Sequence, residues 1–120
     1  MTYDQNNIFA KIIRGDIPCN FIYETEHVAA FDDIAPQAPV HVLVIPKGQY
    51  KSLTEFSAQA SAEELEHFHH AIAHVIKDKG LTENGYRAIC NTDSHGGQEV
   101  PHFHMHILGG EKMPPMLVKS

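Results

Sequence analysis

Three histidines stand at alternate positions near the end of the sequence, in PHFHMHIL: His102, His104 and His106. Successive side chains of a β-strand point to opposite faces, so a strand over residues 102–108 would carry all three imidazoles on one face. The apolar residues between them would share the other face and pack into the core: Phe103, Met105 and Ile107. We therefore predict a strand anchored by its apolar side that presents a row of imidazoles on the other.

Such a row could arise by chance in a chain with 10 histidines, or it could bind a metal or carry a reaction. Strand residues rise about 3.3 Å each, which would separate the Cα atoms of His102 and His106 by about 13 Å, an awkward span for one zinc ion. A pair joined by His41 would be easier, and Glu99 could complete that set. Neutral imidazole is a nucleophile near pH 7, and phosphoryl transfer depends on positioning and charge stabilisation. The spacing therefore favours a reaction at phosphorus.

The remaining histidines have less specific settings. His41 lies in the apolar run VHVLVIP, where a lone histidine is usually a satisfied core residue. Four others fall in a predicted helix and are assigned to the surface or an interface, because no cysteine or carboxylate set there makes a credible metal site: His67, His69, His70 and His74. The two cysteines, Cys19 and Cys90, read as small buried apolar residues.

The elements that must position these residues follow from hydrophobic periodicity and caps. Residues 8–14 predict a short helix between Asn7 and Gly15, and residues 61–79 predict a long one that begins with the capping-box pair Ser61 and Glu64. Strands are predicted at 21–24, 28–32, 40–45, 86–91 and 102–108. This order, with short strands that are mainly antiparallel, indicates an α+β domain.

Length and composition bound the class of protein. The 120 residues suit a single domain, 1–120, with a short C-terminal arm at about 111–120 after the last predicted strand. A net charge of −6 argues against a nucleic-acid or anionic-membrane partner. No stretch reaches the roughly 20 apolar residues of a membrane helix, and no secretory signal precedes the domain. We expect a cytoplasmic protein with reduced thiols.

The motif and the segments around it resemble a known family. HFHMHIL fits the histidine triad pattern at every position, and IFAKIIRGDIP, AFDDIAPQAPVHVLVIPK and NGYRAICNTDSHGGQEVPHFHMHILGG resemble bacterial members of the Hint branch of the histidine triad (HIT) family. The resemblance implies a five-stranded antiparallel sheet with two helices, and a homodimer whose sheets join into one of ten strands. His106 also matters, because the uridylyltransferase branch has glutamine there. It points to a hydrolase.

The resemblance assigns roles to the histidines. His104 would attack the α-phosphorus of a nucleotide and form a nucleotidyl-histidine, which water then releases as nucleoside monophosphate. His106 would contact the phosphate and help to protonate the leaving group. His102 would orient His104, partly through its backbone carbonyl, and His41 would relay protons. No cofactor and no bound metal are implied.

The same resemblance supplies a nucleotide-binding set. Asp33 would bind the ribose hydroxyls, and Asn91 would lie near the phosphate. The loop residues Gly97, Gln98 and Glu99 would contact the phosphate, although the glutamate stands where eukaryotic relatives have serine. Glycine permits close backbone approach, and backbone N–H groups can hold phosphate oxygens. The apolar lining of the base pocket is expected from Ile8, Phe9, Ile12, Phe31, Ile34 and Leu43.

The implied substrates are purine nucleoside 5′-phosphoramidates of the AMP or GMP type and compounds that resemble aminoacyl-adenylates. One alternative is a dinucleoside polyphosphate hydrolase of the same superfamily. Another is a nucleotide-binding regulatory protein whose chemistry is vestigial, and a third is a zinc-dependent module. The complete histidine set favours the hydrolase.

Overall fold

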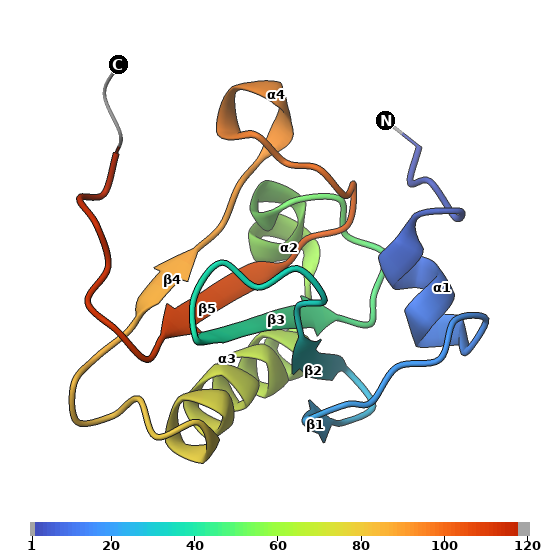
Figure 1. Cartoon of the computed structure of the whole chain (residues 1–120). Helices are drawn as coiled ribbons and strands as arrows, with labels where there is room; N and C mark the ends of the chain where they lie inside the picture. The colour runs from blue at the N-terminus through green and yellow to red at the C-terminus, as the bar shows by residue number, and fades with distance from the viewer. Residues whose placement is uncertain (1, 118–120) are drawn as a thin grey trace.

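A five-stranded antiparallel sheet forms the centre of the molecule, with strand order β1-β2-β3-β5-β4 (Figure 1). The computed structural model describes residues 2–117. The strands are β1 Tyr23–Glu24, β2 Val28–Asp32, β3 Val40–Pro46, β4 Arg87–Ile89 and β5 Met105–Gly109. The helices are α1 Ile8–Arg14, α2 Leu53–Gln59, α3 Ala62–Asp78 and α4 Asp93–Gly96. The predicted α+β class and antiparallel sheet are confirmed.

The two predicted helices form where their caps place them. The Asn7 side chain accepts a hydrogen bond from the backbone N–H of Ala10, and Gly15 ends α1 in the left-handed region at φ 84°. Ser61 and Glu64 form the predicted capping box at the start of α3. Figure 1 shows α3 passing behind the central strands, where Phe68 and Val75 are buried against the sheet.

Each face of the sheet has its own apolar cluster, because alternate residues of β2 and β3 point to opposite sides. Val42, Val44, Phe103 and Ile107 lie in the cluster under α3. Leu43 and Ile45 lie in the other, with residues of α1. The predicted alternation around the histidines is thus confirmed for Phe103 and Ile107, and the imidazoles lie on the α1 side.

Two short helices, α2 and α4, were not predicted, and the histidine-bearing strand is shorter than expected. β5 begins at Met105, so the segment that carries His102 and His104 leads into the strand rather than lying within it. The Phe103 N–H donates to the Tyr50 carbonyl oxygen at 2.8 Å, which ties that segment to the chain before α2. The predicted C-terminal arm runs along the surface, where Arg87 donates to the Pro114 carbonyl oxygen at 2.7 Å. Its last three residues, 118–120, lie outside the described part of the chain.

The sequence predicts no membrane-spanning segment, and the lengths of the observed helices can be compared with this prediction. Among residues 2–117, no helix is both long and apolar enough to cross a membrane.

Candidate active site

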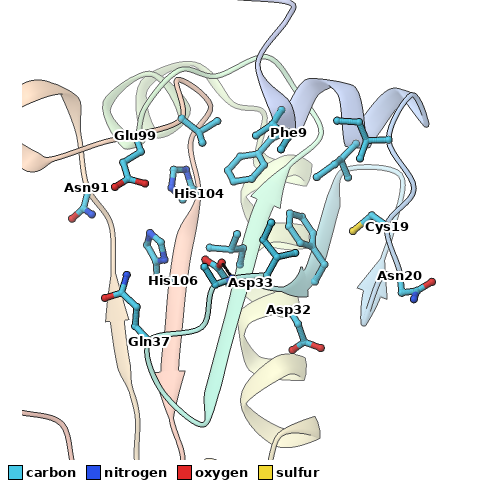
Figure 2. Close-up of a pocket in the computed structure, with 18 of the residues that line it drawn as sticks. Phe9, Cys19, Asn20, Asp32, Asp33, Gln37, Asn91, Glu99, His104 and His106 are labelled. Carbon is cyan, nitrogen blue, oxygen red and sulfur yellow. Dashed lines mark hydrogen bonds between the residues drawn. The ribbon is translucent and has the colours of Figure 1, made fainter.

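A pocket of about 740 Å³ opens between α1, the loop after β2 and the segment that precedes β5 (Figure 2). His104 and His106 line it together with most of the residues predicted to bind a nucleotide. These are Ile8, Phe9, Ile12, Phe31, Asp33, Ile34, Leu43, Asn91, Gly97 and Glu99. Figure 2 shows Asn91 and Glu99 on one side of the two histidines and Phe9 on the other. The pocket therefore has a polar side and an apolar side, with imidazoles between them.

The His104 imidazole has a defined tautomer. Its Nδ1 lies 2.7 Å from the His102 carbonyl oxygen, which can only accept, so Nδ1 carries the hydrogen. The Nε2 atom then keeps a lone pair. Burial lowers the pKa of His104, an effect that the Asp33 and Glu99 carboxylates partly oppose. The Phe9 ring meets the imidazole edge-on at a centroid distance of 5.0 Å. His104 is thus a neutral, oriented imidazole at pH 7, whose Nε2 lone pair is chemically able to act as a base or a nucleophile.

His102 is buried and does not line the pocket. Its side chain is fully buried, and Nε2 lies 2.8 Å from the Pro46 carbonyl oxygen, to which it donates. The Tyr3 hydroxyl lies 2.6 Å from Nδ1 and donates to it. Desolvation by burial lowers the pKa of His102 to about 4. Because both ring nitrogens are held, the residue fixes its own carbonyl, which in turn orients His104.

His106 and His41 form a second oriented pair. The Gln37 backbone N–H donates to His41 Nδ1 at 3.1 Å, so the hydrogen of neutral His41 lies on Nε2. That Nε2 is 2.9 Å from His106 Nδ1 and donates to it. His106 therefore carries its own hydrogen on Nε2. Burial is the main cause that lowers the pKa of His106 to about 4, with smaller contributions from His104 and His41. At pH 7 His106 is a neutral hydrogen-bond donor.

Asp33 links the histidine pair to the loop after β2. One carboxylate oxygen accepts from the Ala35 N–H at 2.9 Å, and the other lies 3.4 Å from His41 Nε2. Each oxygen retains capacity for a further donor. The carboxylate thus stabilises the His41 Nε2–H and also lines the pocket.

Gln98 lies outside the pocket lining, unlike its predicted neighbours Gly97 and Glu99. Its amide nitrogen donates to the carbonyl oxygens of Lys51 and Val100, and its amide oxygen accepts from the Asp93 N–H. The side chain is therefore engaged in holding the loop in shape.

Asp33, His41 and His106 also come within metal-binding reach, with one ligand atom of each within 4.8 Å of the others. The two imidazole nitrogens that approach, however, are hydrogen-bonded to each other with a proton between them. An ion would have to displace that proton and the oriented pair with it. The donor set is better suited to moving protons than to holding a cation.

Several residues of the site had no sequence signal. Tyr3 lies 99 positions from its partner His102, and the partners supplied by Gln37 and Pro46 are backbone groups that a sequence does not display. The segment after α1 adds further lining residues, namely Ile17, Pro18, Cys19 and Asn20. The pKa of Cys19 is raised by burial, which favours the neutral thiol.

Fold and pocket together define the class of protein: a small α+β domain whose antiparallel sheet brings two histidines of an HxHxH sequence into a pocket, with the third buried behind them. Comparison with known proteins agrees. Residues 14–113 match the HIT domain. An uncharacterized HIT-like protein of Azospirillum brasilense is 48% identical over 99% of this chain and 98% of its own. The chain belongs to the histidine triad (HIT) family.

Two further relatives make the likeness more specific. The purine nucleoside phosphoramidase of Escherichia coli strain K12 is 44% identical over 94% of each chain. The solved structure of a HIT family hydrolase from Clostridium thermocellum superposes with a TM-score of 0.86 at 42% identity, covering 96% of this chain and 99% of that one. In sequence and fold this chain therefore resembles HIT family hydrolases.

Proposed function

We propose that this protein hydrolyses purine nucleoside 5′-phosphoramidates, and related aminoacyl-adenylate-like compounds, through a nucleotide bonded covalently to His104. The observation that carries the proposal is the hydrogen bond from His104 Nδ1 to the His102 carbonyl oxygen. It leaves the Nε2 lone pair free in a residue that lines the pocket. The phosphoramidase relative supports the choice of substrate.

The histidine tautomers suggest how the reaction proceeds. His104 Nε2 attacks the phosphorus, and the P–N bond breaks as the nucleotidyl-histidine forms. His106 directs its Nε2–H at the leaving nitrogen and passes it a proton, while one proton from solvent enters the His41–His106 pair, so that neither ring is left as an imidazolate. His41, through its Nε2–H bond to His106 Nδ1, can pass a proton in the same direction. In the second step water attacks the adduct and loses a proton through His106 to solvent, which releases the nucleoside monophosphate and restores neutral His104 and His106.

The two sides of the pocket fit the two ends of a nucleotide. We place the purine base among the apolar residues around Phe9 and Leu43, and the ribose hydroxyls at Asp33. The phosphate would then face the Gly97 backbone, while the Glu99 carboxylate on that side disfavours a second negative charge. A dinucleoside polyphosphate carries more negative charge than a phosphoramidate, so this carboxylate favours the phosphoramidate.

We also expect the homodimer implied by the family resemblance. β4 is an edge strand of the sheet with an exposed Ala88, and the adjacent Tyr86 side chain is 48% exposed. Edge strands offer unpaired backbone groups to a second chain. Two copies joined along β4 would extend the sheet to ten strands.

The decisive experiment is His104→Ala assayed with an adenosine 5′-phosphoramidate. Loss of a covalent nucleophile should lower kcat by about 10⁴-fold or more while AMP binding persists, because the apolar pocket and Asp33 are intact. His70→Ala, an exposed histidine of α3, is the matched control and should keep full activity. Mass spectrometry of the wild-type protein quenched during turnover should find the adenylyl group on His104. Turnover near wild-type in His104→Ala, or a label on another residue, would refute the mechanism.

A further inference from the structure

A group of histidine and glutamate side chains, which are residue types that can bind metals, lies outside the active-site pocket, where the β1–β2 turn meets α3. Glu26 and His27 belong to the turn, and Glu63 and His67 stand one helical turn apart on α3. One ligand atom from each of the four lies within 4.8 Å of the other three. None of the four lines the pocket. Two imidazoles and two carboxylates thus converge from two elements that are far apart in sequence.

His67 is oriented as a metal-binding histidine usually is. Its Nδ1 lies 2.9 Å from the Thr25 hydroxyl oxygen, which also accepts the His27 backbone N–H at 3.1 Å. Metal-bound histidines commonly donate their second ring N–H to an oxygen in this way, which fixes the tautomer and leaves the other nitrogen for the ion. His67 Nε2 lies 3.9 Å from Glu63 Oε1. Thr25 therefore supports both the helix histidine and the turn.

Of the four side chains, His27 has the atom that most needs a partner. Its Nε2 is buried and has no hydrogen-bond partner among residues 2–117, although buried polar atoms are nearly always partnered. It lies 3.4 Å from Glu63 Oε1 and 3.9 Å from Glu26 Oε1. The backbone behind it is fixed, because the Lys47 N–H donates to the His27 carbonyl oxygen at 2.8 Å. A held imidazole directs an unpartnered nitrogen at two carboxylates.

The spacing is close to that of a tetrahedral site. Two ligands about 2.0–2.1 Å from a zinc ion stand about 3.3 Å apart, and His27 Nε2 and Glu63 Oε1 are 3.4 Å apart. The pairs of ligand atoms that are farther apart must approach each other by about 0.5–1.5 Å to reach the ligand–ligand distance of a tetrahedral zinc site. Side-chain rotation can supply this, because the Glu26 and Glu63 side chains are 71% and 62% exposed. Two neutral imidazoles with two carboxylates carry a charge of −2, which a divalent ion neutralises.

We propose that Glu26, His27, Glu63 and His67 form a second site that binds a divalent transition-metal ion, with Zn²⁺ the best fit to its N₂O₂ donor set. Oxygen-preferring Mg²⁺ and Ca²⁺ suit it poorly, because half of its donors are imidazoles. The bound ion ties the β1–β2 turn to the first turns of α3. Its role is structural, because the residues of the pocket take no part in it.

Calorimetric titration of the chelator-treated full chain with ZnCl₂ tests the proposal. Wild-type protein should bind one ion per chain with micromolar or tighter affinity and gain thermal stability, whereas MgCl₂ should have neither effect. The double variant His27→Gln/His67→Gln should lose affinity by at least about tenfold. His69→Gln/His70→Gln, which changes two exposed histidines of the same helix, should bind as wild-type does. His104→Ala/His106→Ala should also retain the ion, which separates this site from the pocket.

Substitution with Co²⁺ adds a spectroscopic test, because a tetrahedral Co²⁺ site absorbs strongly in the visible range. The wild-type protein should show these bands, and His27→Gln/His67→Gln should lack them. Should that double variant fail to fold, Glu63→Gln on the surface of α3 provides a milder removal of one ligand and should still weaken binding. Unchanged zinc affinity in the foldable cluster variant would place the ion elsewhere and overturn the proposal. Absence of wild-type binding at millimolar zinc would also overturn it and leave only ion pairs at this cluster.

Discussion

Replacement of His102 by glutamine should make the protein's stability less sensitive to acid. The imidazole is fully buried between the Pro46 carbonyl oxygen and the Tyr3 hydroxyl. A glutamine amide can donate to the first and accept from the second, so the substitution keeps both hydrogen-bonding roles. It removes the titrating group. The change therefore separates the protonation of this residue from its packing.

The size of the effect follows from the pKa of His102, which burial lowers from 6.5 to about 4. Well above pH 6.5 the residue is neutral in both the folded and the unfolded chain, and its contribution does not vary with pH. As the pH falls from 6.5 toward 4, the unfolded chain takes up the proton first, so the folded state loses stability. Between pH 7 and pH 5 this linkage amounts to about 2 kcal/mol in the free energy of unfolding. The lowered pKa values of His104 and His106 add losses of the same sign.

Urea unfolding at pH 7 and pH 5, followed by circular dichroism, measures the effect. The wild-type protein should lose about 2 kcal/mol more between the two pH values than His102→Gln does. His70→Gln, which removes an exposed histidine from α3, should behave like wild-type. Comparing the pH-dependent loss rather than absolute stability cancels any packing cost of the substitution. Equal losses in wild-type and His102→Gln would refute the claim that His102 becomes protonated only when the chain unfolds.

Two further predictions concern the decrease of kcat/KM at low pH and the packing of Phe103, which lies between His102 and His104. Because burial lowers the pKa values of His104 and His106, kcat/KM for a phosphoramidate should stay level down to pH 6.5 and fall only below it; an acid limb above pH 6.5 would contradict this. Phe103 is 1% exposed and packs at centroid distances of 5.1 Å from both Phe56 and Phe68. Phe103→Ala should therefore lower the free energy of unfolding, measured with urea, by about 3–5 kcal/mol. A loss below about 1 kcal/mol would show that these three aromatic rings do not anchor the segment that carries His102 and His104.

Local rules account for the parts of the fold that could be predicted from sequence. The caps of α1 and α3 depend on residues within three or four positions of each other, and the alternation around His104 depends on strand geometry alone. The helix α2 shows the limit of such rules. Its Ser52–Glu55 capping box was present in the sequence, but seven residues give too little periodicity to distinguish a short helix from a loop.

The candidate site, like the fold, could be predicted from the sequence only in part. The family resemblance predicted most of the residues that line the pocket, but the different contacts and burial of the three triad histidines depend on partners that are distant in sequence. His102 is buried because Tyr3 and the Pro46 carbonyl group close over it. The cluster around His27 could not be predicted from the sequence either. Glu63 and His67 are close together on α3, but nothing in the sequence indicates that the β1–β2 turn brings two more side chains next to them.

The proposed relay from His41 to His106 depends on the register between two strands. Antiparallel pairing places Leu43 opposite His106 and His41 opposite Leu108, so the two histidines are diagonal neighbours on one face of the sheet. Diagonal neighbours lie within reach of long side chains, and here the nitrogens meet at 2.9 Å. A shift of one residue in β3 would turn His41 into the apolar cluster under α3 and bring a valine to the pocket side. Val42 and Val44, which are fully buried, resist that shift, because it would take them out of the cluster under α3 and put His41 in their place. The same alternation that builds the core therefore also brings together the two nitrogens of the proposed proton path.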